Sequence, residues 1–260
     1  MTPTISPEKS RHLLARYEIW NDRFLYLAVA WREDSQIYTA HHTCRMASFD
    51  SNPTALNELE GTVIQHDLVY AAWREDITEV TMPLPRNTFV KTPEYLSELS
   101  KPDLINAEIN ILELLSKTPH PNVCKYYGCI RDGAYVMGIC LQKLEFTLAE
   151  LVEGRDDKLP TLDEARIVSD VKAGLDFLHS LGLVHDDINP SNIMLDDGGR
   201  AVIIDFDSCV PLGSQSRGGT PGWSTFPKIA EIQNDEHGLD LVAKFVRGEY
   251  DGQDFEAFDK

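Results

Sequence analysis

Glycine is scarce in the first half of this 260-residue chain, where Gly61 is the only glycine before Gly128. A loop that wraps its backbone around a phosphate group needs several closely spaced glycines, because only glycine allows such a close backbone approach. The sequence therefore predicts that no glycine-rich phosphate loop precedes Gly128.

Cysteine and basic side chains are also few. The five cysteines are scattered without C-x-x-C spacing, which argues against a zinc site. Their odd number argues against a complete disulfide framework. Lysine and arginine number 24 against 42 aspartates and glutamates, which gives a formal net charge of −18. A surface this negative repels phosphate backbones and anionic lipids, so we expect neither nucleic-acid nor membrane binding.

Long apolar runs are missing as well. No stretch approaches the ~20 apolar residues of a membrane-spanning helix. The first residues also lack the apolar core of a secretory signal. We therefore expect an intracellular, reducing compartment, either the cytoplasm or the nucleus.

Hydrophobic periodicity predicts strands in the first half and mainly helices in the second. Strands are expected over residues 24–31, 36–43, 68–73, 77–82, 87–91, 123–130 and 135–141. Helices are expected over residues 13–20, 54–64, 104–117, 148–153 and 161–181. This order indicates an α+β protein of two lobes, joined near residues 142–146.

The most informative segment is Leu175–Leu195, in which His185, Asp187 and Asn192 follow the end of a predicted helix. Farther along, a short apolar strand leads directly into Asp205. This set resembles the catalytic loop (H-R-D-L-x-x-x-x-N) and the D-F-G element of the eukaryotic protein kinases. The resemblance implies a two-lobed protein-kinase-like fold, with an antiparallel sheet and one main helix in the first lobe.

The resemblance also implies roles for individual residues in a reaction that uses ATP and Mg²⁺. Asp205 and Asn192 would supply the hard oxygen ligands of a metal that bridges the phosphates. Asp187 would orient the acceptor hydroxyl and take its proton. Lys91 would hold phosphates and pair with Glu108, as the corresponding lysine and glutamate do in the family.

By the same resemblance, Leu141, Gln142 and Leu144 at the junction of the lobes are expected to contact the nucleotide. The chain would then divide into an N-terminal extension (1–67) packed on or extending the first lobe, a sheet lobe (68–144) and a shortened, mainly helical lobe (145–260). The overall pattern is similar to short, divergent kinase-like proteins of filamentous fungi.

Several positions depart from the family pattern. Asp186 replaces the arginine that receives an activation-loop phosphate, so control by such phosphorylation is not expected. Asn189 replaces a lysine near the transferred phosphoryl group, which removes a positive charge there. Asp207 occupies the glycine position of the D-F-G element, as in aminoglycoside and choline kinases, and Lys228 replaces the glutamate of the A-P-E element.

Three functions remain open at this stage. The first is transfer of the γ-phosphate of Mg·ATP to serine or threonine hydroxyls of proteins. The second is a pseudokinase that serves as a protein interaction module, which the missing glycine loop and Asn189 favour. The third is a small-molecule kinase, which Asp207 favours, although His120-Pro121-Asn122 and Gly219-Thr220-Pro221-Gly222-Trp223 are typical of protein kinases.

Overall fold

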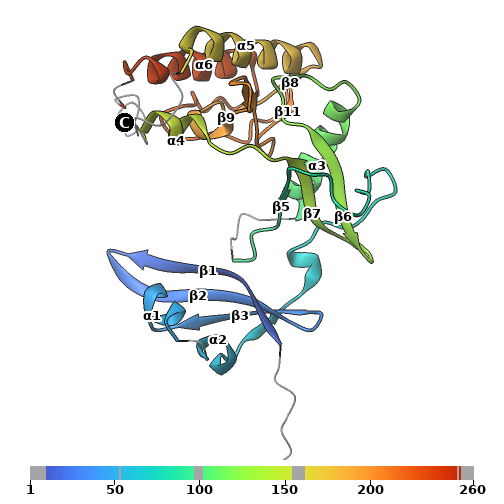
Figure 1. Ribbon diagram of the computed structural model, residues 1–260, viewed down its shortest axis with the longest axis vertical. Helices are drawn as coiled ribbons and strands as arrows, with labels where there is room; N and C mark the ends of the chain where they lie inside the picture. Colours follow the sequence, from blue (N-terminus) through green and yellow to red (C-terminus); the bar gives the residue numbers. More distant parts are fainter. Residues whose placement is uncertain (1–9, 53, 97–101, 154–161, 251, 253–260) are drawn as a thin grey trace, which may run out of the picture. The chain divides into compact units, whose positions relative to one another are not determined.

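The computed structural model describes residues 10–52, 54–96, 102–153, 162–250 and 252. The chain divides into two compact units (Figure 1). The first comprises Met1–Trp73, Thr92–Asn106 and Arg131–Met137, and the second comprises Arg74–Lys91, Ala107–Ile130 and Gly138–Lys260. The domain boundaries after residues 67 and 144 stay a prediction.

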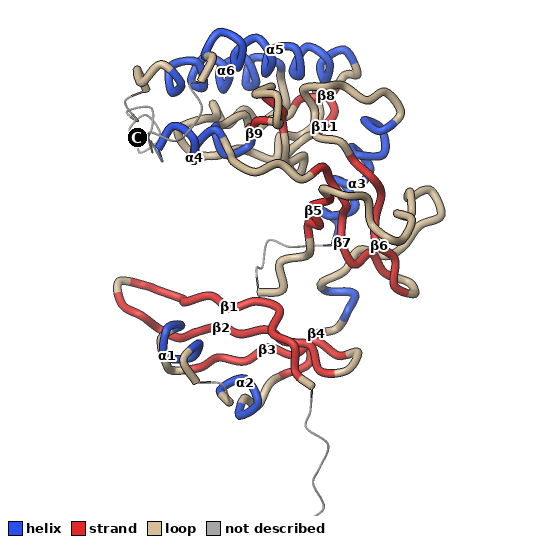
Figure 2. The backbone as a smooth tube through the Cα atoms, viewed as in Figure 1, coloured by secondary structure: helices blue, strands red, loops and turns tan. Residues whose placement is uncertain are grey.

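The first unit is built on a four-stranded antiparallel sheet, coloured red in Figure 2. Its strands in spatial order are β1 (Arg11–Asn21), β2 (Arg23–Glu33), β3 (Gln36–His42) and β4 (Thr62–Ile64). The strands predicted over 24–31 and 36–43 are confirmed, but the helix predicted over 13–20 is wrong. That segment is β1, because it pairs with β2 over nearly its whole length after a turn at Asp22, and this ladder outweighs the local helical preference of the segment.

Two short helices, α1 (Met46–Asp50) and α2 (Ala55–Glu58), pack on one face of this sheet. Phe49 of α1 and Ala55 of α2 are buried against Trp31 and its neighbours on β2. The helix predicted over 54–64 is therefore confined to α2, and the rest of that range leads into β4. A short 3-10 turn, η1 (His66–Leu68), follows β4.

A second, three-stranded sheet carries three of the residues predicted to bind the nucleotide, Lys91, Leu141 and Gln142. It consists of β5 (Thr88–Lys91), β7 (Tyr135–Gln142) and β6 (Tyr126–Asp132), with β7 in the centre. Within the described ranges, no strand pairs with the outer edge of β5.

Two predicted strands of this region are wrong. Residues 68–73 and 77–82 each contribute only an isolated bridge, Ala72 to Tyr135 and Glu79 to Cys129. In the latter segment the N–H of Thr78 donates to the Glu113 side chain (2.6 Å) rather than to a neighbouring strand.

The remaining elements are mainly helical. The helices are α3 (Pro102–Ser116), α4 (Leu148–Glu153), α5 (Glu164–Ser180) and α6 (Ile232–Val246), which confirms the helices predicted over 104–117, 148–153 and 161–181. Between α5 and α6 lie β8 (Leu183–Val184), the 3-10 turn η2 (Pro190–Asn192), β9 (Ile193–Leu195), β10 (Ala201–Ile203) and β11 (Val210–Pro211).

Helix α5 organises this part of the second unit. It starts at Asp163, whose side chain accepts from the N–H of Arg166, so one free donor of the first turn is satisfied. It packs against α6 and β10, and Figure 1 shows α5 and α6 side by side. The segment between α5 and α6, which contains the short strands, is therefore packed against helix α5. Of the helices described, none has the length and apolar character needed to cross a bilayer.

Candidate active site

Lys91, at the end of β5, is held between two carboxylates. Its Nζ lies 2.8 Å from Oε1 of Glu108 on α3 and 2.7 Å from Oδ1 of Asp205, which follows β10. Glu108 is almost fully buried, whereas Lys91 and Asp205 are each about one-third exposed. Three residues far apart in the sequence therefore meet here, as the kinase resemblance predicts.

The charges in this cluster oppose one another. Burial by itself lowers the pKa of Lys91, but the carboxylates of Glu108 and Asp205 outweigh this effect and raise the pKa above its ordinary value. Lys91 is therefore a firmly charged ammonium at neutral pH. An ammonium in this position can bind a phosphate oxygen as a point charge.

The strand β5 also positions an aromatic side chain beside Lys91. Residues two apart in a strand point to the same face, so Phe89 lies on the face of Lys91, and it is 52% exposed. Across the ladder, Phe89 pairs with Leu141, and Thr88 pairs with Gln142. Leu141 is buried, and Gln142 and Leu144 are half-buried at and after the end of β7.

Asp187 lies in the loop between β8 and η2, and its carboxylate is hydrogen-bonded on both oxygens. Oδ1 accepts from the backbone N–H of Thr220 (2.7 Å) and from Nδ2 of Asn189 (3.1 Å). Oδ2 accepts from Nδ2 of Asn192 (3.0 Å) and from the hydroxyl of Thr220 (3.2 Å). These contacts fix the plane of the carboxylate before any substrate is bound.

Asn189 has a role that the sequence comparison missed. It was predicted only as the loss of a positive charge, yet its amide is buried and donates both to Asp187 and to Thr220 Oγ1 (3.1 Å). Its own oxygen accepts from the N–H of Ser191. The G-T-P-G segment was recognised in the sequence, but nothing in that pattern indicates that Thr220 binds Asp187.

Asn192 and Asp205 suit a magnesium ion by their chemistry. The amide nitrogen of Asn192 donates to the carbonyl and carboxylate of Asp187, which leaves its amide oxygen as an acceptor. Asp205 uses one oxygen on Lys91 and retains the other. Mg²⁺ characteristically takes one or two protein oxygens and completes its shell with phosphate and water. Among the described residues, no cluster of three or more His, Cys, Asp or Glu side chains could form a fuller cage.

The loop that carries Asp187 is held by hydrogen bonds to α6. The buried carboxylate of Asp235 accepts from the backbone N–H groups of His185 (2.9 Å) and Asp186 (2.8 Å) and from Nε2 of His179 (2.8 Å). The imidazole of His185 is buried, donates from Nε2 to the carbonyl of Ile204 and meets the ring of Phe206 edge-on. These contacts join the catalytic loop to α5, to α6 and to the residues that follow β10.

Comparison with known proteins shows which family this chain resembles. Residues 87–236, more than half of the chain, match the family model described as "Protein kinase domain". The serine/threonine-protein kinase/endoribonuclease IRE2 of Homo sapiens is 32% identical over 158 residues, 56% of this chain and 17% of that protein. The serine/threonine-protein kinase Tao of Drosophila melanogaster is 32% identical over 146 residues, 55% of this chain and 12% of that protein.

A solved structure agrees at the level of the fold. The yeast RNA Pol II CTD kinase CTDK-1 complex contains a chain with a TM-score of 0.52 and 17% identity, over 62% of this chain and 55% of that one. The predicted α+β, two-lobed kinase-like fold is therefore confirmed. The matching segment contains every residue of the Lys91, Asp187 and Asp205 clusters, and the chain belongs to the protein kinase domain family.

Proposed function

We propose that this chain transfers the γ-phosphate of Mg·ATP to serine or threonine hydroxyls of a protein substrate. The observation that carries the proposal is the position of Lys91 Nζ between Glu108 and Asp205, in the same compact unit as the four-fold hydrogen-bonded carboxylate of Asp187. Lysine, metal ligand and base are the groups that kinase-type phosphoryl transfer requires.

Asp187 would accept the proton of the attacking hydroxyl. The donors that surround it, from Asn189, Asn192 and Thr220, restrict the rotation of its carboxylate. A carboxylate that is held in one orientation loses little freedom when the acceptor hydroxyl binds, so positioning contributes to the rate along with proton transfer.

Lys91 would bind phosphate oxygens of ATP, and Phe89, Leu141, Gln142 and Leu144 would contact the rest of the nucleotide. Asn192 and Asp205 would hold Mg²⁺, which neutralises charge on the phosphates when it is bound. Lys91 already neutralises Asp205 in part. The ammonium would therefore have to share Asp205 with the metal, and Glu108 would keep it in place during that exchange.

The acceptor class is supported by the relatives, whose names describe serine/threonine-protein kinases. The chain spans only 17% and 12% of the length of these two proteins, so the acceptor belongs to the proposal. A small-molecule acceptor is less well supported: the residue that suggests it, Asp207, is exposed, and its carboxylate contacts only the neighbouring Ser208 hydroxyl among the described hydrogen bonds.

A second candidate is a pseudokinase interaction module. It is favoured by the absence of a glycine-rich segment before Lys91, where Gly61 is the only glycine, and by the unpaired outer edge of β5 within the described residues. Without strands over this edge, fewer backbone groups are available to cover the phosphates. Phosphate transfer would then be slow or absent although the fold is intact.

The experiment is transfer of labelled phosphate from γ-labelled Mg·ATP to mixed serine- and threonine-containing protein acceptors. The control is Asp187→Ala, in which the base is missing. Transfer at least about a hundredfold above this control is expected, the lower end of the range for a general base. Label that does not exceed the control would refute the kinase proposal and leave the pseudokinase. Label that reaches only small alcohols would support the third alternative.

A further inference from the structure

Asp186 directs its buried side chain toward the segment that runs past the active site. The residue has φ of 69°, a conformation that few non-glycine residues adopt, and its side chain is fully shielded from solvent. Its Oδ2 accepts from the hydroxyl of Ser216 (2.6 Å) and from the N–H of Arg217 (3.1 Å). Its Oδ1 accepts from Nδ2 of Asn234 on α6 (2.9 Å).

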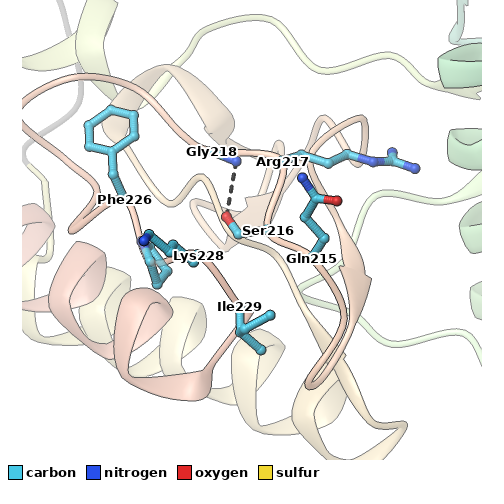
Figure 3. A pocket seen from close by; sticks show the side chains of 8 residues that line it. Gln215, Ser216, Arg217, Gly218, Phe226, Lys228 and Ile229 are labelled. Atoms are coloured by element: carbon cyan, nitrogen blue, oxygen red, sulfur yellow. Dashed lines mark hydrogen bonds between the residues drawn. The ribbon is translucent and has the colours of Figure 1, made fainter.

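The hydroxyl of Ser216 takes part in two hydrogen bonds. It accepts from the N–H of Gly218 (3.0 Å), the dashed line in Figure 3, and it donates to Asp186. In the bond with Gly218 the proton comes from the backbone N–H, so the single proton of the hydroxyl remains available for the carboxylate of Asp186. The hydrogen bond is therefore of the strong, charge-assisted kind.

The same segment reaches Asp187 four residues later. Gly219 passes so close to the catalytic loop that an added Cβ would lie 2.7 Å from the carbonyl oxygen of Asp186. Thr220 then donates from both its backbone N–H and its hydroxyl to Asp187. Two adjacent acids thus hold two ends of one short segment, residues 216–220.

Within the described residues, the groups that contact the Asp186 carboxylate are all neutral donors, from a hydroxyl, a backbone amide and a side-chain amide. Burial raises the pKa of Asp186, against the opposing effect of these hydrogen bonds. The guanidinium of Arg217 donates to the carbonyl of Asp207 instead. The carboxylate of Asp235 also acts on Asp186 by repulsion. A further anion placed at half-buried residue 216 would face the buried Asp186 carboxylate, and the two would repel each other.

We propose that Ser216 and Asp186 form a latch that holds residues 216–220 on the catalytic loop, so that Thr220 positions Asp187, and that negative charge at residue 216 opens the latch. Ser216 and Asp186 are positioning residues in this scheme. The effect of charge is the reverse of that in kinases where an arginine beside the catalytic aspartate receives a phosphate. The latch itself is a property of the folded chain, and only its kinetic consequence rests on the proposed phosphate transfer.

The first test is hydrogen exchange of the full chain at neutral pH, followed at the amides of residues 217–220. Ser216→Ala is expected to speed exchange about tenfold or more, the effect of losing a hydrogen bond to a charged acceptor. The matched control is Ser214→Ala, which lies in the same segment and also loses a serine hydroxyl bond, to the carbonyl of Pro211. Ser216→Thr keeps the hydroxyl and should restore slow exchange. Equal exchange in Ser216→Ala and Ser214→Ala would overturn the proposal.

The second test changes the charge. Ser216→Glu should exchange at least as fast as Ser216→Ala, while Ser214→Glu should resemble the unchanged chain. Slower exchange in Ser216→Glu would contradict the latch, because it would mean that an anion closes the segment. Asp186→Asn provides a check from the other side and should speed exchange at the same amides. Unchanged exchange in that variant would also count against the proposal.

The third test is kinetic and applies once transfer is measurable. Ser216→Ala should lower kcat/KM for the protein acceptor about tenfold and leave the nucleotide Kd unchanged, because Lys91 and Asp205 do not contact the segment. An equal loss in nucleotide affinity would indicate a general structural defect rather than positioning. If no variant transfers phosphate, the exchange results still decide about the latch, and only the proposed function fails.

Discussion

The two sides of the candidate active site differ in how they are supported. On the side of the catalytic loop, the carboxylates of Asp186, Asp187 and Asp235 together accept hydrogen bonds from several separate stretches of chain. On the side of β5, the Lys91 side chain has two carboxylate partners, and the strand that carries it pairs with β7 on one edge but has no described neighbour on its outer edge.

The two sides should therefore contribute to different properties of the protein. The loop side is complete in the absence of any ligand, so substitutions there should mainly reduce the free energy of unfolding or the rate of transfer. On the β5 side, no described strand covers the outer edge of β5, so a bound nucleotide and its metal would themselves order part of this side. Substitutions there should mainly change nucleotide affinity and the stabilisation that a bound nucleotide provides.

The largest effect is expected from removing the anchor of the loop. Asp235→Ala leaves two backbone N–H groups and an imidazole without their acceptor in a buried place. We expect a loss of about 3–5 kcal/mol in the free energy of unfolding, measured by urea denaturation. Asp240→Ala, on the exposed side of the same helix, removes only an ion pair with Lys244 and should cost at most about 1 kcal/mol. Similar losses in the two variants would show that the hydrogen bonds of Asp235 to the loop do not contribute more to stability than an exposed ion pair.

A smaller effect is expected from the ion pair on the β5 side. Lys91→Met leaves the buried Glu108 without its cation, and we expect a loss of about 2–3 kcal/mol, less than for a fully buried pair because the Lys91 side chain is 32% exposed. In the double variant Lys91→Met/Glu108→Leu both charges are gone, and denaturation should show much of the stability restored. Additive losses in the double variant would mean that the pair is not coupled.

The smallest effect is expected from the nucleotide. Mg·ATP at ten times its Kd should stabilise the folded chain by about 1.4 kcal/mol, seen as a rise of about 2–4 °C in Tm. A chelator should abolish the magnesium-dependent part, and Asp205→Asn should respond like the chelated protein. An undiminished rise in Asp205→Asn would exclude Asp205 as a metal ligand. No rise in the unchanged chain would favour a scaffold that binds no nucleotide.

The sequence was sufficient for the fold and for the residues whose identity the chemistry dictates. Asp187, Asn192, Asp205, Lys91 and Glu108 were all recognised, because kinase chemistry accepts few substitutes at these positions. The strands of the second sheet, β5 to β7, and the helices α3, α4 and α5 were predicted because each has its own periodicity and turn signals. Their roles in binding and catalysis stay a prediction.

The errors and omissions have physical causes. The segment 13–20 was expected to be helical, but pairing with β2 decided its structure, and pairing depends on residues farther along the chain. Likewise, Asp186 and Asn189 were interpreted as the loss of an arginine and a lysine. Their actual partners, Ser216 and Thr220, lie about thirty residues farther along the chain. No local pattern indicates which hydroxyl a carboxylate will meet.

The bonds from α6 to the catalytic loop also impose an order on biosynthesis. They join residues 48 to 50 positions apart, with Asn234 and Asp235 always the later partners. A ribosome releases the loop first, so the loop cannot take its final form until the beginning of α6 has emerged and docked. Until then, the amides of His185 and Asp186 have no carboxylate to bind. The loop that carries Asp187 would therefore reach its final form late, after the residues that precede α6 have left the ribosome.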